Sequence, residues 1–240
     1  MNLSSIRPSN DGMTIDVAPA PSLSRRLAAE ALGSFFLFAT VVGSGIMGAA
    51  LGDGNDAIVL LGNTLATGAM LYVLIVKLAP LSGGHFNAAV TLAFALRREV
   101  KARDAALYLV VQLGAGLLGV LAAHAMFDLP LLQVSTRLRD GPGQWLSEAI
   151  ATFGLLITIL GTIRHRPASV PASVALYIAS AYWFTASTSF ANPTITLARS
   201  MTDSFAGIAP SSVLPFILAQ LAGAAVALPV ARWLFAADAQ

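Results

Sequence analysis

Cysteine is absent from the 240-residue sequence, which excludes disulfides, thiolate metal sites and thiol chemistry. Charge is scarce as well, because Asp, Glu, Lys and Arg make up 11% of the chain, against about 25% in soluble domains. Hydrophobic residues make up 56%, and the mean hydropathy is +0.75. So few charges cannot cover the surface of a soluble globule of this size, and intrinsic disorder requires the opposite composition. The composition therefore predicts a polytopic membrane protein.

The sequence also lacks the patterns of enzymes and nucleic-acid-binding proteins. It contains no nucleophile triad, no phosphate-binding loop and no metal-ligand cluster. The net charge is only +2, without the clustered basic face that nucleic acid requires. We therefore expect no catalysis, no cofactor, no metal and no nucleic-acid partner.

Residues 1–22 differ from the rest of the chain. They are polar, contain three prolines and have no apolar core of signal-peptide length. This composition predicts a disordered cytoplasmic tail rather than a targeting peptide. Residues 23–240 then form the membrane domain.

Six stretches approach the roughly 20 apolar residues that a membrane-spanning helix needs. They are Leu27–Ala50, Ala57–Leu78, Ala105–Phe127, Trp145–Ile163, Ser173–Thr188 with its flanks, and Ser212–Phe235.

Two further apolar stretches, Asn87–Leu96 and Asn192–Met201, are too short to span. Ten helical residues cover roughly 15 Å, which is half of a hydrocarbon core about 30 Å thick. A half-length helix is tolerated at membrane depth only where it lines a cavity inside the protein. A matching pair of such helices therefore indicates a site near the midplane.

The chain repeats itself in the same order in each half. Asn87–Ala93 (NAAVTLA) aligns without a gap with Asn192–Ala198 (NPTITLA). Glu30 in the first span corresponds to Glu148 in the fourth, and Gln112 in the third corresponds to Gln220 in the sixth. Three spans per half is an odd number, so the second half must enter the membrane inverted. The halves are predicted at about 24–127 and 142–236.

The distribution of basic residues predicts the orientation. With the N-terminus inside, eleven of the fourteen Lys and Arg residues lie on the cytoplasmic side, and Arg137, Arg139 and Arg199 lie outside. This is a positive-inside bias. We expect a multi-pass protein of the cell membrane with both termini in the cytoplasm.

Each short helix begins with an asparagine, which is a preferred N-cap. In the inverted arrangement, the helix ends at Asn87 and Asn192 meet near the midplane. Each end carries roughly half a positive charge, so the pair repels cations and protons. An asparagine that caps its own helix keeps its NH₂ group free to donate to a passing solute. The arrangement therefore favours neutral, hydrogen-bonding solutes over ions.

These motifs resemble those of the aquaporin and glycerol-facilitator (major intrinsic protein) family. The resemblance rests on Ser82–Thr91 (SGGHFNAAVT), Ala191–Thr194 (ANPT) and the two helices that carry glutamate, and it covers about residues 24–236. It implies six spans, two re-entrant half-helices, one pore per subunit and a homotetramer. It also implies passive transport of water or small uncharged solutes.

The sequence departs from the family's Asn-Pro-Ala signature at Ala88 and Thr194. The resemblance also implies an outer filter, whose positions carry over by spacing to Thr67, Ser180, Ser189 and Ile195. Ile195 stands where the family usually has arginine. Small, polar filter residues favour a broad pore for polyols, urea-like molecules or neutral metalloid hydroxides.

Arg199 lies one helical turn beyond Ile195, and helical side chains lean toward the helix N-terminus. Our hypothesis is that Arg199 supplies the missing positive charge. The alternative is that it extends to the outer surface or pairs with Asp203 at i+4.

Three other polar residues are candidates for support of the pore. Glu30 and Glu148 lie inside spans, where a carboxylate needs partners. We expect each to accept hydrogen bonds from a re-entrant loop, and the alternative is a proton relay. His85 precedes Asn87 by two residues and either orders the loop or responds to pH.

The prediction is a passive channel, with small neutral solutes and the lipid bilayer as partners. A secondary transporter also uses inverted repeats and broken helices, but it would need acids or cation ligands near the midplane. A non-conducting adhesion protein is a third interpretation, which the small, polar filter residues disfavour.

Overall fold

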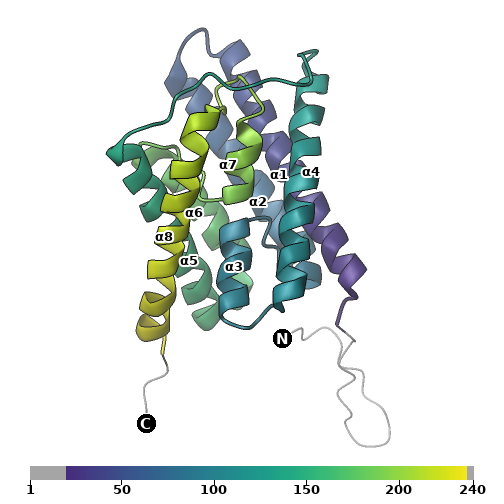
Figure 1. The fold of residues 1–240 in the computed structure, drawn as a ribbon, viewed down its shortest axis with the longest axis vertical. Helices are drawn as coiled ribbons and strands as arrows, with labels where there is room; N and C mark the ends of the chain where they lie inside the picture. The colour runs from purple at the N-terminus through teal and green to yellow at the C-terminus, as the bar shows by residue number, and fades with distance from the viewer. Residues whose placement is uncertain (1–19, 237–240) are drawn as a thin grey trace, which may run out of the picture.

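The computed structural model describes residues 20–236, and its regular structure there is entirely helical (Figure 1). The predicted tail falls almost wholly on residues 1–19, which lie outside the described residues. The α-helices are α1 (Leu23–Leu51), α2 (Asp56–Ser82), α3 (Ala88–Leu96), α4 (Ala102–Met126), α5 (Pro142–His165), α6 (Val170–Phe184), α7 (Pro193–Arg199) and α8 (Pro210–Leu234). The prediction of an all-α membrane fold with two half-helices is confirmed.

Within the described residues, five helices are long and apolar enough to cross a membrane: α1, α2, α4, α5 and α8. The fifth predicted span corresponds to α6, which has 15 residues and follows a short 3₁₀ turn at Pro167–Ser169. The prediction of helix through Thr188 is wrong, because the helix ends at Phe184. Thr185 turns to an extended backbone there, and its Oγ1 donates to the carbonyl of Ala181 at 2.6 Å.

The two halves of the chain pack in the same way. In the first half α1 contacts α2 and α4, and in the second half α5 contacts α6 and α8. Contacts between α2 and α6 join the halves, while α3 and α7 each touch both α4 and α8. Figure 1 shows α7 above α3, between α4 and α8. Both half-helices are thus enclosed by spanning helices, as backbone at membrane depth requires.

The helices α5 and α8 approach so closely at Gly223 that no larger residue fits there. A Cβ atom on Gly223 would lie 2.1 Å from the carbonyl oxygen of Ala149. The two helices would have to move apart to remove this clash, because the Ala149 oxygen belongs to the backbone and not to a flexible side chain.

We therefore expect Gly223→Ala to lower the free energy of unfolding by about 1–3 kcal/mol, the usual cost of overpacking. Thermal unfolding of the purified protein in detergent measures the change. Gly114→Ala is the matched control, since a Cβ there meets nothing within 4 Å and alanine is the better helix former. Equal unfolding temperatures for both variants would contradict the close α5–α8 contact.

Candidate pore and selectivity filter

The tips of the two half-helices touch inside the bundle. Asn87 Oδ1 accepts a hydrogen bond from Ala89 N at 2.8 Å, and Asn192 Oδ1 accepts one from Thr194 N at 3.1 Å. Each asparagine amide also reaches across to the other loop. Asn87 Nδ2 donates to the carbonyl of Ala191 at 2.8 Å, and Asn192 Nδ2 donates to that of Phe86 at 2.9 Å.

An asparagine NH₂ group has two hydrogens, and the contact with the opposite loop uses one of them. Both Asn87 and Asn192 line the central cavity. The second hydrogen of each amide is therefore available to a solute in the cavity, while the first fixes the orientation of the side chain.

Glu30 of α1 holds the loop that leads into α3. Its two carboxylate oxygens accept from the backbone N–H groups of His85 at 3.0 Å and Phe86 at 2.8 Å. They also accept from Ser82 Oγ at 2.6 Å and Gln112 Nε2 at 2.8 Å. A carboxylate whose oxygens are occupied in this way is suited to fixing a loop rather than to passing protons along the pore.

Glu148 of α5 holds the loop that leads into α7 in the same manner. It accepts from the N–H groups of Phe190 at 2.8 Å and Ala191 at 2.9 Å, and from Gln220 Nε2 at 2.6 Å. Both glutamates are fully buried. Fixed loops matter because Phe86 and Ala191 adopt positive φ angles of 46° and 47°, a conformation that costs free energy for residues other than glycine.

One threonine, which the sequence analysis did not single out, completes each network. Thr91 Oγ1 accepts from Gln112 at 2.9 Å and donates to the carbonyl of Asn87 at 3.0 Å. In the second half, Thr196 Oγ1 accepts from Gln220 Nε2 at 2.8 Å and donates to the carbonyl of Asn192 at 2.8 Å. Each half-helix is therefore tied by its first turn to the spanning helix behind it. The aligned threonines in NAAVT and NPTIT were the signal that could have revealed them.

His85 lies in the first loop and lines the cavity. Its Nδ1 is 3.1 Å from Thr91 Oγ1, and its ring packs against Phe94 and Tyr108, with centroid distances of 5.0 and 5.6 Å. Contacts on several sides hold this imidazole in one orientation.

A cavity of about 360 Å³ runs past the two asparagines. One wall is apolar and is formed by aliphatic side chains of α1, α2, α5, α6 and α7, among them Val41, Leu71, Ile159, Ile178 and Ile195. The lining also includes the two asparagines and residues of the re-entrant loops. The cavity therefore offers both apolar and hydrogen-bonding groups.

The loops offer hydrogen-bond acceptors to this cavity. Within residues 20–236, no donor is bonded to the carbonyl oxygens of Gly83, Gly84, His85, Ser189 or Phe190, all of which line it. Buried carbonyl groups are normally paired with protein, water or ligand. These oxygens can therefore accept hydrogen bonds from water or from a solute hydroxyl.

Thr67, Tyr182, Ser189 and Arg199 also line the cavity. Tyr182 Oη lies 3.4 Å from Thr67 Oγ1. Ser189 Oγ is buried without a hydrogen-bond partner among the described residues. These four residues thus add three hydroxyl groups and one guanidinium to the cavity lining.

The prediction that Ser180 belongs to the outer filter is wrong. Its side chain is exposed and does not line the cavity, whereas Tyr182, two residues further on, does. The gapless carry-over failed because α6 ends at Phe184, and the residues after it form an irregular loop with Thr188 and Ser189 at positive φ. Counting residues without gaps across such an irregular loop does not identify the residue that faces the cavity.

The comparisons with known proteins agree with this geometry. Residues 18–190 match the family model described as Major intrinsic protein. This chain belongs to the major intrinsic protein family.

Individual relatives support the assignment. The chain is 54% identical over 212 residues to Aquaglyceroporin AqpS of Rhizobium meliloti, covering 88% of this chain and 91% of that protein. It is 35% identical over 162 residues to the Lens fiber major intrinsic protein of Gallus gallus, covering 65% of this chain and 59% of that one. The crystal structure of the aquaglyceroporin from Plasmodium falciparum has a TM-score of 0.70 at 18% identity, covering 90% and 96% of the two chains, and therefore shows the shared fold.

As a member of the major intrinsic protein family, the chain departs from the Asn-Pro-Ala signature at Ala88. The backbone N–H of Ala88, which a proline would lack, lies 3.4 Å from Asn192 Oδ1. The second half has proline at the matching position, Pro193. The departure therefore adds a weak contact between the half-helices and leaves α3 helical from its first residue.

This family member also has Ile195 in place of the usual arginine. Ile195 lies in the apolar wall, and Arg199 of the next turn lines the same cavity. Arg199 is 1% exposed, and its Nε donates to the carbonyl of Ala206. Its guanidinium carbon lies 3.3 Å from the centre of the Phe190 ring.

Arg199 neither extends to the outer surface nor pairs with Asp203, so both alternatives considered for it are wrong. A side chain that is 1% exposed does not extend to the surface. Asp203 is bound elsewhere, because its Oδ1 accepts from Thr136 N and Oγ1, each at 2.9 Å. These bonds lower the pKa of Asp203 below its usual range.

A second buried arginine, Arg139, holds the loop outside the cavity and was missed as a structural residue. It donates to the carbonyls of Gly207 at 2.8 Å, Ser187 at 3.1 Å and Phe205 at 3.2 Å. Its guanidinium lies 5.0 Å from the centre of the Phe190 ring. Arg139 does not line the cavity, and its guanidinium is bonded to the carbonyls of the surrounding loops.

The positions of Tyr182 and Ser180 can be tested by paired substitutions. We expect Tyr182→Ala to raise the permeability ratio of erythritol to glycerol about tenfold, since a pocket wall discriminates by roughly 1–3 kcal/mol. Solute uptake into proteoliposomes measures the ratio. Ser180→Ala is the matched control on the same helix and should leave the ratio unchanged. A larger effect from Ser180→Ala than from Tyr182→Ala would reverse the assignment.

Proposed function

We propose that the protein is a passive channel for water and small uncharged solutes such as glycerol. The observation that carries this proposal is the meeting of two capped half-helices beside an amphipathic cavity. The family membership and the similarity to Aquaglyceroporin AqpS support it independently.

The arrangement of the half-helices explains the exclusion of charge. Each N-terminus carries roughly half a positive charge, and both point toward the same position in the pore. Arg199 also lines this cavity and adds a positive charge. A cation or hydronium ion would approach all three in a space walled mainly by protein, where electrostatic interactions are stronger than in bulk water.

The same arrangement explains passage of hydroxyl compounds. A polyol has carbon atoms on one side and hydroxyl groups on the other. Its carbon side can lie against the aliphatic wall around Ile159 and Ile178. Its hydroxyl groups can donate to the free loop carbonyls and accept from Asn87 and Asn192. Each hydrogen bond to water is thus replaced as the solute moves, which keeps the barrier low.

Thr67, Tyr182, Ser189 and Arg199 form the selectivity filter in this proposal. Their support is that all four line the cavity and carry hydroxyl or guanidinium groups. Ile195 removes the polar group that the family usually places here, so the filter is less polar along one side. Neutral metalloid hydroxides have the size and hydrogen-bonding groups of a polyol and belong to the solutes to be tested.

A coupled transporter would require acidic or cation-binding groups at the centre of the pathway. Among the described residues, Glu99 is the carboxylate that lines the cavity, and it lies on the loop after α3 rather than beside the asparagines. Glu30 and Glu148 already accept hydrogen bonds from the loops. These features support passive permeation.

The proposal includes a homotetramer in the cell membrane with both chain ends in the cytoplasm. The excess of Lys and Arg on the side where α3 ends supports this orientation. The homotetramer in this proposal is supported by membership of the family.

Light scattering from proteoliposomes tests the function. We expect rapid volume changes under water and glycerol gradients, and uptake of neutral arsenite, without any proton or sodium gradient. Empty vesicles set the background. Ile178→Trp, which places a larger side chain in the cavity wall, should reduce flux strongly, whereas Leu176→Trp on the exposed face of α6 should not. Flux equal to that of empty vesicles, or flux that requires an ion gradient, would contradict the proposal.

A further inference from the structure

A second hollow lies away from the pore, where α3 and α8 end side by side (Figure 1). Its volume is about 540 Å³. Three arginines and three apolar residues line it: Arg97, Arg98, Arg232, Leu96, Leu228 and Pro229. The pore mechanism uses none of these residues.

The positive charge in this hollow is only partly neutralised. Arg97 Nε forms an ion pair with Glu99 at 2.6 Å. Within residues 20–236, neither Arg98 nor Arg232 has a carboxylate within 4 Å. Two uncompensated guanidinium groups therefore flank the hollow from two different elements, the loop after α3 and the last turn of α8.

The loop that presents Arg98 is fixed by its own backbone. The N–H groups of Arg97 and Arg98 donate to Ala93 O at 3.1 Å and Ala95 O at 2.9 Å, and Glu99 N donates to Phe94 O at 3.0 Å. These bonds fix the backbone that carries Arg98, while no carboxylate of residues 20–236 lies within 4 Å of the Arg98 or Arg232 guanidinium. The charges are thus left available for an external ligand.

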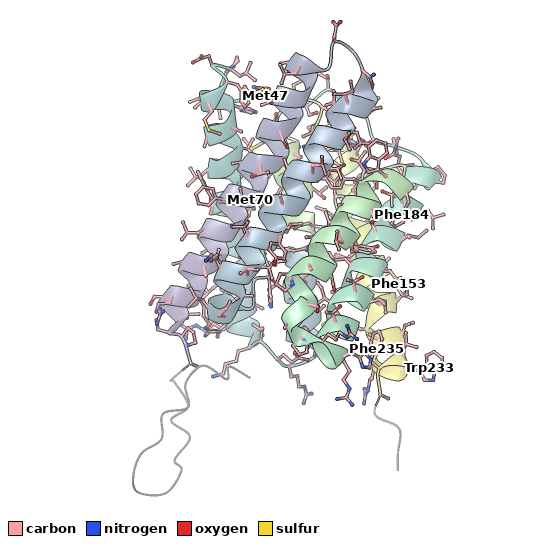
Figure 2. The ribbon with its side chains drawn as sticks, turned by 180° about the vertical axis from the view of Figure 1, so that it is seen from behind. Met47, Met70, Phe153, Phe184, Trp233 and Phe235 are labelled. Atoms are coloured by element: carbon pink, nitrogen blue, oxygen red, sulfur yellow. The ribbon has the colours of Figure 1, made fainter. Side chains whose placement is uncertain are left out.

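The apolar part of the hollow indicates what kind of anion would bind. Leu96 is 73% exposed beside the arginines, and Trp233, next to Arg232, is 78% exposed. Figure 2 shows Trp233 pointing away from the bundle at the end of α8. Tryptophan is typical of the membrane–water boundary. A free phosphate ion would gain nothing from Leu96 or Leu228, whereas an acyl chain would.

We propose that this hollow binds the headgroup of an anionic phospholipid. Its phosphate lies between Arg98 and Arg232, and its acyl chains run along Leu96, Leu228 and Trp233. Basic hollows between helices at the cytoplasmic boundary suit such headgroups, and each arginine adds about fivefold to affinity. The lipid would join the half-helix α3 to the spanning helix α8.

Fluorescence quenching provides the test. The Trp145→Phe and Trp183→Phe substitutions leave Trp233 as the single tryptophan reporter in the full-length protein. Brominated phosphatidylglycerol or brominated phosphatidylcholine is then titrated into the detergent-solubilised protein. We expect phosphatidylglycerol to quench at a much lower mole fraction than phosphatidylcholine. Arg98→Gln combined with Arg232→Gln should raise the half-quenching mole fraction of phosphatidylglycerol about thirtyfold.

Arg103→Gln is the matched control, because Arg103 is exposed near the start of α4 and does not line the hollow. Glycerol flux of each variant reports that the protein is folded. Equal quenching by both lipids, or an equal loss of affinity in Arg103→Gln, would overturn the proposal. Displacement of the brominated lipid by millimolar inorganic phosphate would also overturn it, by identifying a free-phosphate site.

Discussion

Replacing Arg199 by alanine is expected to raise the permeability of the channel to protons and small cations about a hundredfold. A unit charge a few ångströms away contributes about 3 kcal/mol at an effective dielectric constant of about 20, and each 1.4 kcal/mol corresponds to a factor of ten in rate. Arg199 is the arginine beside the filter hydroxyls, where the family's usual position holds Ile195. A pH-sensitive dye inside proteoliposomes measures the proton leak.

Two further variants separate charge from packing at this position. Arg199→Lys keeps a positive charge and should retain most of the proton exclusion, although it loses the planar contact with Phe190. Arg137→Ala removes an exposed arginine of the loop before α5 that does not line the cavity, so it should behave as the unmodified protein. If Arg199→Ala excludes protons and selects solutes as the unmodified protein does, Arg199 has no filter role.

Replacing Glu148 by alanine is expected to abolish flux and to lower the free energy of unfolding by at least about 3 kcal/mol. Two backbone N–H groups and the amide of Gln220 lose their acceptor in the interior. Each buried donor left without a partner costs about 1–3 kcal/mol. The loop before α7 also loses the contact that maintains the positive φ angle of Ala191. Thermal unfolding in detergent and glycerol flux measure the two effects.

Graded variants make this prediction specific to the hydrogen bonds. Glu148→Gln keeps one oxygen acceptor but turns an NH₂ group toward a backbone N–H, so we expect an intermediate loss. Asp128→Asn changes an exposed carboxylate in the loop after α4 and should have no effect. An unfolding temperature of Glu148→Ala close to that of the unmodified protein, with flux preserved, would show that the carboxylate does not hold the loop.

The two networks around Glu30 and Glu148 are nearly identical, yet the pore they support is not symmetric. The first loop carries His85 and the glycine pair Gly83–Gly84, whereas the second carries Ser189, and Arg199 of α7 lines the same cavity. Repetition therefore fixes the scaffold, while the differences between the repeats determine which groups the solute meets at each end.

The sequence by itself determined the membrane-helical class, the two half-helices and their asparagine caps. These follow from local properties, namely the length of apolar runs, cap preferences and the internal repeat. The paired residues Glu30 and Glu148 could be located in the same way, because a carboxylate inside a span stands out against its surroundings.

Tertiary structure alone decided which residues face the pore at the filter. Tyr182 rather than Ser180 lines the cavity, because the end of α6 and the irregular loop after it set the facing residue. Arg199 is buried against Phe190 and Ala206 instead of reaching the surface or Asp203, and those partners come from other segments of the chain. Spacing along a sequence specifies which residues share a face of one helix, but contacts between separate segments determine what that face meets.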